Sequence, residues 1–351
     1  MQTLALIGVA AAVGTLALAA GGCKGAVSRQ AMRPAEAAAP APPAFPQATL
    51  DNGLLRLTVY LPDAEKGIYR ATRFAWSGVI ARAEFDGHTV YGPFRAKSDP
   101  LTCDNNIMGP AEEFDLETSP PGYVEAKPGE AFLKIGVGAL LKPDEPKYQF
   151  WNLYKFAKPP VWKVTAAEDR LILRQEAEQG GWGYVYTRQI SLVPGERIFI
   201  ITYILKNTGT KAIDTLFYCH NFTIIDDEPI GPNYDIAFPF PLVNVQEARG
   251  QMMFQDNEIV IPEVVEGSLW AVLAPDPGKV EDNKVRIFNR RTGTALHIDG
   301  AWAPMSWRFY AEKTAACPEP FLRIQLAPGE EKTWYTTYSF GAAKGKEAKN
   351  P

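Results

Sequence analysis

The chain has 351 residues, of which 36 are Lys or Arg and 40 are Asp or Glu, giving a formal net charge of −4. Nucleic-acid binding relies on clustered Lys and Arg, so this balance disfavours a polyanion-binding surface, and we expect no nucleic-acid partner. Hydrophobic residues make up 46% and charged residues 22%, which is typical of a globular protein and excludes a disordered one. The 29 Gly and 29 Pro predict many turns and few long helices.

The first 23 residues read as an export segment. Residues 4–20 are uncharged and mostly apolar, and the small residues Gly21 and Gly22 precede Cys23. A short apolar stretch that ends in small residues is typical of a secretory signal. A Cys directly after small residues resembles the bacterial lipoprotein signal, which implies a periplasmic or outer-membrane location and a membrane tether through lipidated Cys23. A plain cleaved signal and an N-terminal membrane anchor are the alternatives.

Residues 24–48 are rich in Ala and Pro. Such a composition cannot bury a core and tends towards extended geometry, so we expect a semi-rigid spacer. Residues 343–351 form a polar tail at the other end. The folded domain is therefore expected between residues 49 and 342.

The body of the chain shows short runs of alternating or β-branched residues, at 54–60, 170–175, 184–192, 198–205 and 332–340. These are strand patterns. Turn-forming sequences lie between them, and no run of twelve or more residues has clean helical periodicity. We predict one all-β domain built as a large antiparallel β-sandwich.

The cysteines do not suggest a metal site. If Cys23 is lipidated, Cys103, Cys219 and Cys317 remain, and none of them lies in a CxxC pair. Three is an odd number, so at least one thiol is free, and one disulfide of unknown pairing could form. We expect no metal.

The C-terminal half contains a series of short motifs. A strand ending in Asn-Thr-Gly (207–209) precedes a strand that delivers His220, and a strand-borne Glu312 follows later. A rigid Cys-Pro-Glu-Pro loop (317–320) and a closing Leu-Ala-Pro-Gly-Glu turn (326–330) come next. In this order the motifs resemble the galactose mutarotase (aldose 1-epimerase) superfamily. The resemblance implies a large β-sandwich and an enzyme that interconverts sugar anomers without a cofactor.

Residues 69–138 resemble a second group, the uncharacterised bacterial secreted proteins placed near this superfamily. This region contains Arg73, Trp76 and Glu113. The superfamily's usual first-half Arg motif and second His have no recognisable counterpart here.

Mutarotation needs a base that takes the proton of the anomeric hydroxyl and an acid that protonates the ring oxygen. His suits the acid role because its ordinary pKa is about 6.5, and a carboxylate suits the base role. The resemblance assigns these roles to His220 and Glu312, with Glu319 as the competing base. We further expect Arg73, Glu113, Trp76, Asn221 and Glu319 to contact the sugar.

The leading hypothesis is an exported mutarotase-like isomerase that acts on a free sugar or an oligosaccharide end. A non-catalytic carbohydrate-binding protein and a polysaccharide lyase-like enzyme are the alternatives, because large β-sandwiches host all three functions. The near-neutral charge favours an uncharged sugar as partner.

Overall fold

The computed structural model describes residues 45–243, 245–273 and 278–342. The predicted signal segment, most of the predicted spacer and the polar tail lie outside these residues. The first strand begins at Gln47, inside the segment expected to be spacer. None of the described residues forms a helix long and apolar enough to cross a membrane.

The described part of the chain is almost entirely β structure, which confirms the predicted fold class. Its one helix is the 3₁₀ helix η1 (Val280–Asp282). The strands are β1 (Gln47–Asp51), β2 (Arg56–Tyr60), β3 (Val79–Phe85), β4 (His88–Val90), β5 (Gly109–Phe114), β6 (Ala131–Lys134), β7 (Gly138–Leu141), β8 (Trp162–Ala166), β9 (Arg170–Gln179), β10 (Trp182–Leu192), β11 (Ile198–Asn207), β12 (Ile213–Phe222), β13 (Tyr234–Ala237), β14 (Val245–Arg249), β15 (Met253–Gln255), β16 (Glu258–Val260), β17 (Leu269–Leu273), β18 (Lys284–Asn289), β19 (Thr294–Gly300), β20 (Ser306–Glu312), β21 (Ala315–Leu326) and β22 (Glu331–Ala342).

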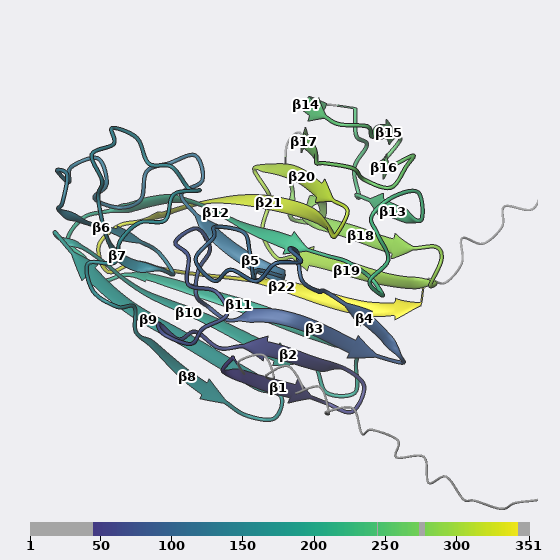
Figure 1. The fold of residues 1–351 in the computed structure, drawn as a ribbon, viewed down its shortest axis with the longest axis horizontal. Helices are drawn as coiled ribbons and strands as arrows, with labels where there is room; N and C mark the ends of the chain where they lie inside the picture. The colour runs from purple at the N-terminus through teal and green to yellow at the C-terminus, as the bar shows by residue number, and fades with distance from the viewer. Residues whose placement is uncertain (1–44, 244, 274–277, 343–351) are drawn as a thin grey trace, which may run out of the picture. The chain divides into compact units, whose positions relative to one another are not determined.

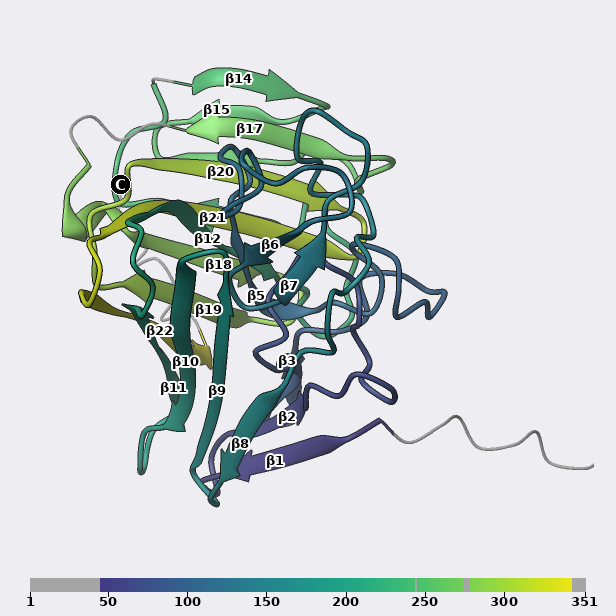
Figure 2. The same ribbon diagram turned by 90° about the vertical axis from the view of Figure 1, so that its left-hand side faces the viewer.

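Two large sheets dominate the arrangement (Figures 1 and 2). A ten-stranded sheet has the order β15-β16-β13-β18-β19-β22-β11-β10-β9-β8, and a six-stranded sheet has the order β14-β17-β20-β21-β12-β5. Neighbouring strands in both sheets pair antiparallel. A four-stranded sheet, β1-β2-β3-β4, and a two-stranded sheet, β6-β7, complete the fold. The antiparallel β-sandwich is thus confirmed.

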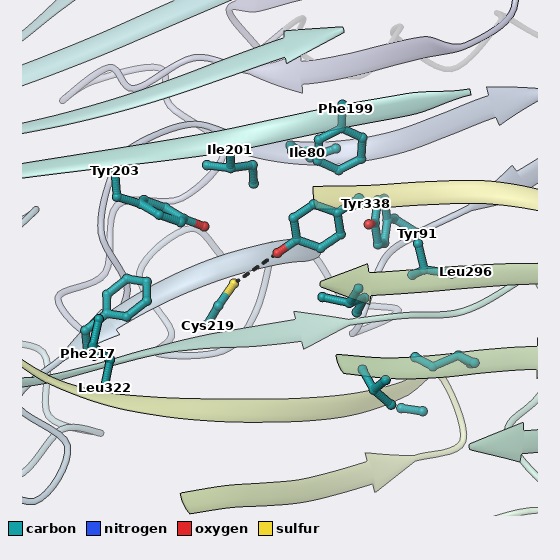
Figure 3. Close-up of a cluster of buried hydrophobic side chains, with 14 of the residues drawn as sticks. Ile80, Tyr91, Phe199, Ile201, Tyr203, Phe217, Cys219, Leu296, Leu322 and Tyr338 are labelled. Carbon is teal, nitrogen blue, oxygen red and sulfur yellow. Dashed lines mark hydrogen bonds between the residues drawn. The ribbon is translucent and has the colours of Figure 1, made fainter. Parts of the chain in front are cut away.

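The main core lies between the two large sheets. Alternation along β12 sends Phe217 and Cys219 into it, where Phe217 packs against Tyr203 of β11 and Cys219 lies beside Tyr338 of β22 (Figure 3). The Cys219 Sγ is 3.7 Å from the Tyr338 hydroxyl, and the Phe199 and Tyr338 rings stack with centroids 4.6 Å apart. Cys103, Cys219 and Cys317 are all free thiols. Because side chains of a strand alternate between its two faces, the neighbouring residues of β12 must point away from this core.

Candidate active site

A cavity of about 390 Å³ lies over the face of the six-stranded sheet that points away from the sandwich core. Four neighbouring strands supply its floor, because alternate residues of each strand point to this face. Loops supply its walls. The lining residues are Tyr218, His220 and Phe222 of β12, Glu319 of β21, Arg308 and Tyr310 of β20, Trp270 of β17, and Arg73, Phe94, Asp104, Leu116 and Phe150 of the loops.

His220 and Glu319 are in direct contact on this floor. The His220 Nε2 lies 3.0 Å from the Glu319 Oε1, and each residue is only 4% exposed. The imidazole stacks on the Phe222 ring with centroids 4.0 Å apart, and the Phe74 ring packs edge-on against it. Apolar rings therefore hold the imidazole in place, while the Nε2 faces a carboxylate that lines the same cavity.

Glu319 lies in the long strand β21, so the expectation that residues 317–320 form a loop is wrong. The pairing of β21 with β12 is interrupted at this segment: it ends at Phe321 and resumes only at the isolated bridge between Ala316 and Thr223. The prolines are tolerated because no β12 ladder bond is needed between these points. In the gap, the side-chain amide of Asn221 donates to the Pro318 carbonyl at 2.8 Å. This interruption places Glu319 beside His220.

Arg73 reaches the cavity from the loop that precedes β3, and a carboxylate behind it fixes its position. Its Nε donates to Glu113 at 2.7 Å and its terminal nitrogen donates to the Tyr218 hydroxyl at 3.1 Å. The Phe74 and Phe150 rings lie 4.5 Å from the guanidinium carbon. Although burial alone would lower it, the Glu113 carboxylate raises the pKa of Arg73 well above its ordinary value. Arg73 lines the cavity and Glu113 does not.

Glu312 is on the same face of the sheet but does not line the cavity. Its carboxylate accepts hydrogen bonds from the guanidinium of Arg95 and from the Tyr310 hydroxyl. Arg95 also binds Asp104 at 3.1 Å, so one arginine ties together two carboxylates at the rim. The carboxylate in contact with His220 is that of Glu319, which the sequence analysis named as the competing base.

Trp76 and Asn221 lie outside the cavity lining. Trp76 is 4% exposed, donates from its indole to the Ala71 carbonyl at 2.7 Å and packs against the Phe156 ring. Asn221 follows His220 in β12 and so points to the opposite face, where its amide oxygen accepts from the Tyr338 hydroxyl at 2.9 Å.

Several lining residues were not among the predicted site residues. Arg308 and Tyr310 flank Phe309 in β20, and Trp270 lies in β17 opposite Tyr310. Their alternation on one face could be read from the sequence, but the pairing of β17, β20 and β21 could not. The loop residues Phe94, Asp104 and Phe150 carry no periodic signal at all.

Both arginines that line the cavity have a carboxylate partner, Glu113 for Arg73 and Glu117 for Arg308. Asp104 shares the guanidinium of Arg95 with Glu312, and Glu319 contacts His220. Within the described residues, no group of three or more His, Cys, Asp or Glu side chains is placed to hold a metal ion. The cavity therefore offers a polar, aromatic surface whose arginines are already paired.

Solved structures share this fold, whereas no protein-family model and no curated protein matches the sequence. A Synechocystis sp. PCC 6803 protein superposes with a TM-score of 0.55 at 11% identity, covering 86% of this chain and 98% of the other. A galactose mutarotase related enzyme from Lactobacillus acidophilus gives 0.52 at 9% identity, covering 85% and 98%. An aldose epimerase homologue from C. elegans gives 0.50 at 12% identity, covering 86% and 100%. The chain therefore has the fold of galactose mutarotase-like and aldose epimerase structures.

Proposed function

We propose that this protein is a mutarotase-like isomerase that interconverts the anomers of a neutral sugar, with His220 and Glu319 as its acid and base. The observation that carries the proposal is the 3.0 Å contact of these two side chains on the floor of the cavity. The likeness of the fold to mutarotase-related structures supports a sugar as the partner.

The reaction requires a proton to leave the anomeric hydroxyl and another to reach the ring oxygen. Both oxygens are bonded to the same carbon, so the acid and the base must be neighbours. In the proposed step the Glu319 carboxylate takes the hydroxyl proton while protonated His220 gives its Nε2 proton to the ring oxygen. The ring opens, the aldehyde rotates, and the reverse transfers close the ring on its other face. The two residues return to their starting protonation states.

The contacts of Glu312 make it the weaker choice of base. Its carboxylate already accepts from Arg95 and Tyr310 and does not line the cavity. Glu319 also has an ion-pair partner, His220, but both of these residues line the cavity, whereas Glu312 and its partner Arg95 do not. The charge pairing within the cavity also favours a neutral sugar over the uronate polymers of polysaccharide lyases, because both lining arginines already have carboxylate partners.

Polarimetry on freshly dissolved α-anomers of a panel of hexoses and pentoses tests the proposal. The protein should accelerate the approach to the equilibrium rotation for at least one sugar. His220→Gln and Glu319→Gln should each lower the catalysed rate by at least about 100-fold, because general acid–base catalysis contributes roughly 10²–10⁴-fold. Glu312→Gln, the matched control, should keep most of the activity.

Two results would contradict this assignment. No acceleration with any sugar of the panel would remove the isomerase, and sugar binding that persists without acceleration would support a non-catalytic binding protein instead. Loss of activity in Glu312→Gln together with full activity in Glu319→Gln would return the base to Glu312. Circular dichroism of each variant separates lost chemistry from lost folding.

The apolar run before Cys23 supports a further part of the proposal, that the protein is exported and tethered through a lipid on this residue. Cells fed a radiolabelled fatty acid should label the wild-type chain and not Cys23→Ala. Equal labelling of both chains would contradict the tether.

A further inference from the structure

We propose that the site binds the reducing end of a neutral disaccharide or longer glycan, with the second sugar ring held against Trp270. This inference rests on the proposed function for the placement of the first ring, whose anomeric carbon lies at the contact of His220 and Glu319. Neither the fold nor the chemistry of mutarotation requires a second ring, because a free monosaccharide already contains every reacting atom.

The cavity is longer than one sugar ring. Its floor runs from His220 on β12 across β21 and β20 to Trp270 on β17. Glu319 and Trp270 are separated by two strand spacings, which is roughly 10 Å at about 4.8 Å per spacing. One hexose ring at the acid–base pair therefore leaves the Trp270 end of the cavity unfilled.

The two ends of the cavity differ in how they are closed. At the Arg73 end, the guanidinium is pinned by Glu113 and lies between the Phe74 and Phe150 rings, and its side chain is 13% exposed. At the Trp270 end, the next strand is the edge strand β14, which is exposed along nearly its whole length. A glycan chain can leave the cavity only where no wall stops it, so it extends over Trp270.

The chemistry at this end suits a sugar ring. Trp270 is half-buried and lines the cavity, and the guanidinium of Arg249 of β14 lies over one face of its ring, 5.4 Å from the centroid. An indole ring packs well against the apolar face of a pyranose, while polar neighbours bind the hydroxyl groups at the ring edge. Tyr310 and Arg308 supply such polar groups from the adjacent strand. Arg308 is already paired with Glu117, which again favours a neutral ligand.

Calorimetric titration of the full-length protein with glucose, galactose, maltose, cellobiose and lactose tests the inference. At least one disaccharide should bind about tenfold more tightly than the monosaccharide at its reducing end. Trp270→Ala should abolish most of that advantage, and Trp270→Phe, which keeps an aromatic face, should retain most of it. Tyr335→Ala is the matched control, because Tyr335 is an aromatic residue that is 47% exposed and does not line the cavity.

The inference is overturned if no disaccharide binds more tightly than its monosaccharide, or if Trp270→Ala leaves the advantage intact. An equal loss of monosaccharide and disaccharide binding in Trp270→Ala would also overturn it, since Trp270 would then contact the first ring. Polarimetry on the same sugars separates the two proposals. Acceleration without a disaccharide preference keeps the isomerase and removes the second binding position. A disaccharide preference without acceleration keeps the position and removes the isomerase.

Discussion

A buried ion pair joins the two large sheets directly behind the site. Arg188 of β10 and Glu112 of β5 are 0% and 1% exposed, and the Arg188 Nε lies 2.9 Å from the Glu112 Oε1. The terminal nitrogens of Arg188 donate to the carbonyls of Ser77 and Gly78 at 3.0 and 2.6 Å, and to that of Pro110 at 3.0 Å. The Ser77 hydroxyl donates to the second oxygen of Glu112. One guanidinium thus forms an ion pair with a carboxylate and donates hydrogen bonds to three backbone carbonyls.

Breaking this pair should destabilise the protein by an amount that depends on which partner is removed. Glu112→Gln keeps the three hydrogen bonds from Arg188 to backbone carbonyls but leaves the buried guanidinium without a negatively charged partner. This loss costs about 3–5 kcal/mol of unfolding free energy. Arg188→Met leaves the Glu112 carboxylate without its cationic partner. It also leaves three buried carbonyls without the hydrogen bonds that they accept from the charged guanidinium. Such bonds contribute roughly 1.5–3 kcal/mol each, so the loss should exceed about 5 kcal/mol. That is comparable with the whole stability of many domains, about 5–15 kcal/mol.

Urea unfolding at pH 7, followed by tryptophan fluorescence and circular dichroism, measures these losses. Asp227→Asn is the matched control, because it removes an exposed carboxylate that also accepts two bonds from an arginine, Arg82. It should cost at most about 1 kcal/mol. The reasoning fails if Glu112→Gln costs no more than Asp227→Asn, or if Arg188→Met is no more destabilised than Glu112→Gln.

Two further predictions concern residues close to the site. Burial raises the pKa of Asp115 from 3.8 to about 6, so the folded state holds a proton that the unfolded state releases. The protonated Asp115 therefore contributes to the unfolding free energy, fully below about pH 4 and no longer above about pH 6. The contribution is about 3 kcal/mol, because each unit of pKa difference corresponds to about 1.4 kcal/mol. The stability of wild type relative to Asp115→Asn should therefore fall between pH 4 and 7 in urea titrations, and a constant difference would contradict the shift. Asn221→Leu removes the amide that bridges β12 to the Pro318 carbonyl and leaves buried groups unpaired, at about 1–3 kcal/mol. It should lower both the unfolding free energy and the mutarotation rate, and an unchanged rate would show that the bridge does not position His220.

The fold class could be predicted because apolar residues alternate with other residues in strands such as β10 and β11. In the structure, buried and less buried side chains alternate along both strands in the same way. The same alternation separates the two faces of β12, so His220 and Asn221 could have been assigned to opposite faces in advance. Face assignment does not give register, however. Which residue of β21 meets His220 depends on how the two strands pair, and the sequence contains no direct record of that pairing.

The sequence could not show that Glu319, and not Glu312, is the carboxylate in contact with His220. A Cys-Pro-Glu-Pro segment is typical of a rigid loop, because proline cannot donate to a ladder. In this fold the ladder beside the prolines is already interrupted, and the Asn221 side chain replaces part of it. Glu312, by contrast, lies in β20, which pairs regularly with β21. Its partner Arg95 comes from a loop more than 200 residues earlier, and no local pattern could reveal that contact.

The positions of the proposed acid and base are fixed by the same alternation that builds the core. His220 and Cys219 are neighbours in β12, as Glu113 and Glu112 are in β5, and in each pair one side chain faces the site and the other faces the sandwich core. A register slip of one residue would exchange them and bury the wrong side chain, so core packing enforces the geometry of the reacting pair. The walls follow different rules, because Phe94, Asp104, Leu116 and Phe150 belong to loops. Loops tolerate change far better than paired strands do. The proposed chemistry of this site is therefore tied to the stability of the fold, whereas changes in the loops could alter which sugar the proposed enzyme accepts.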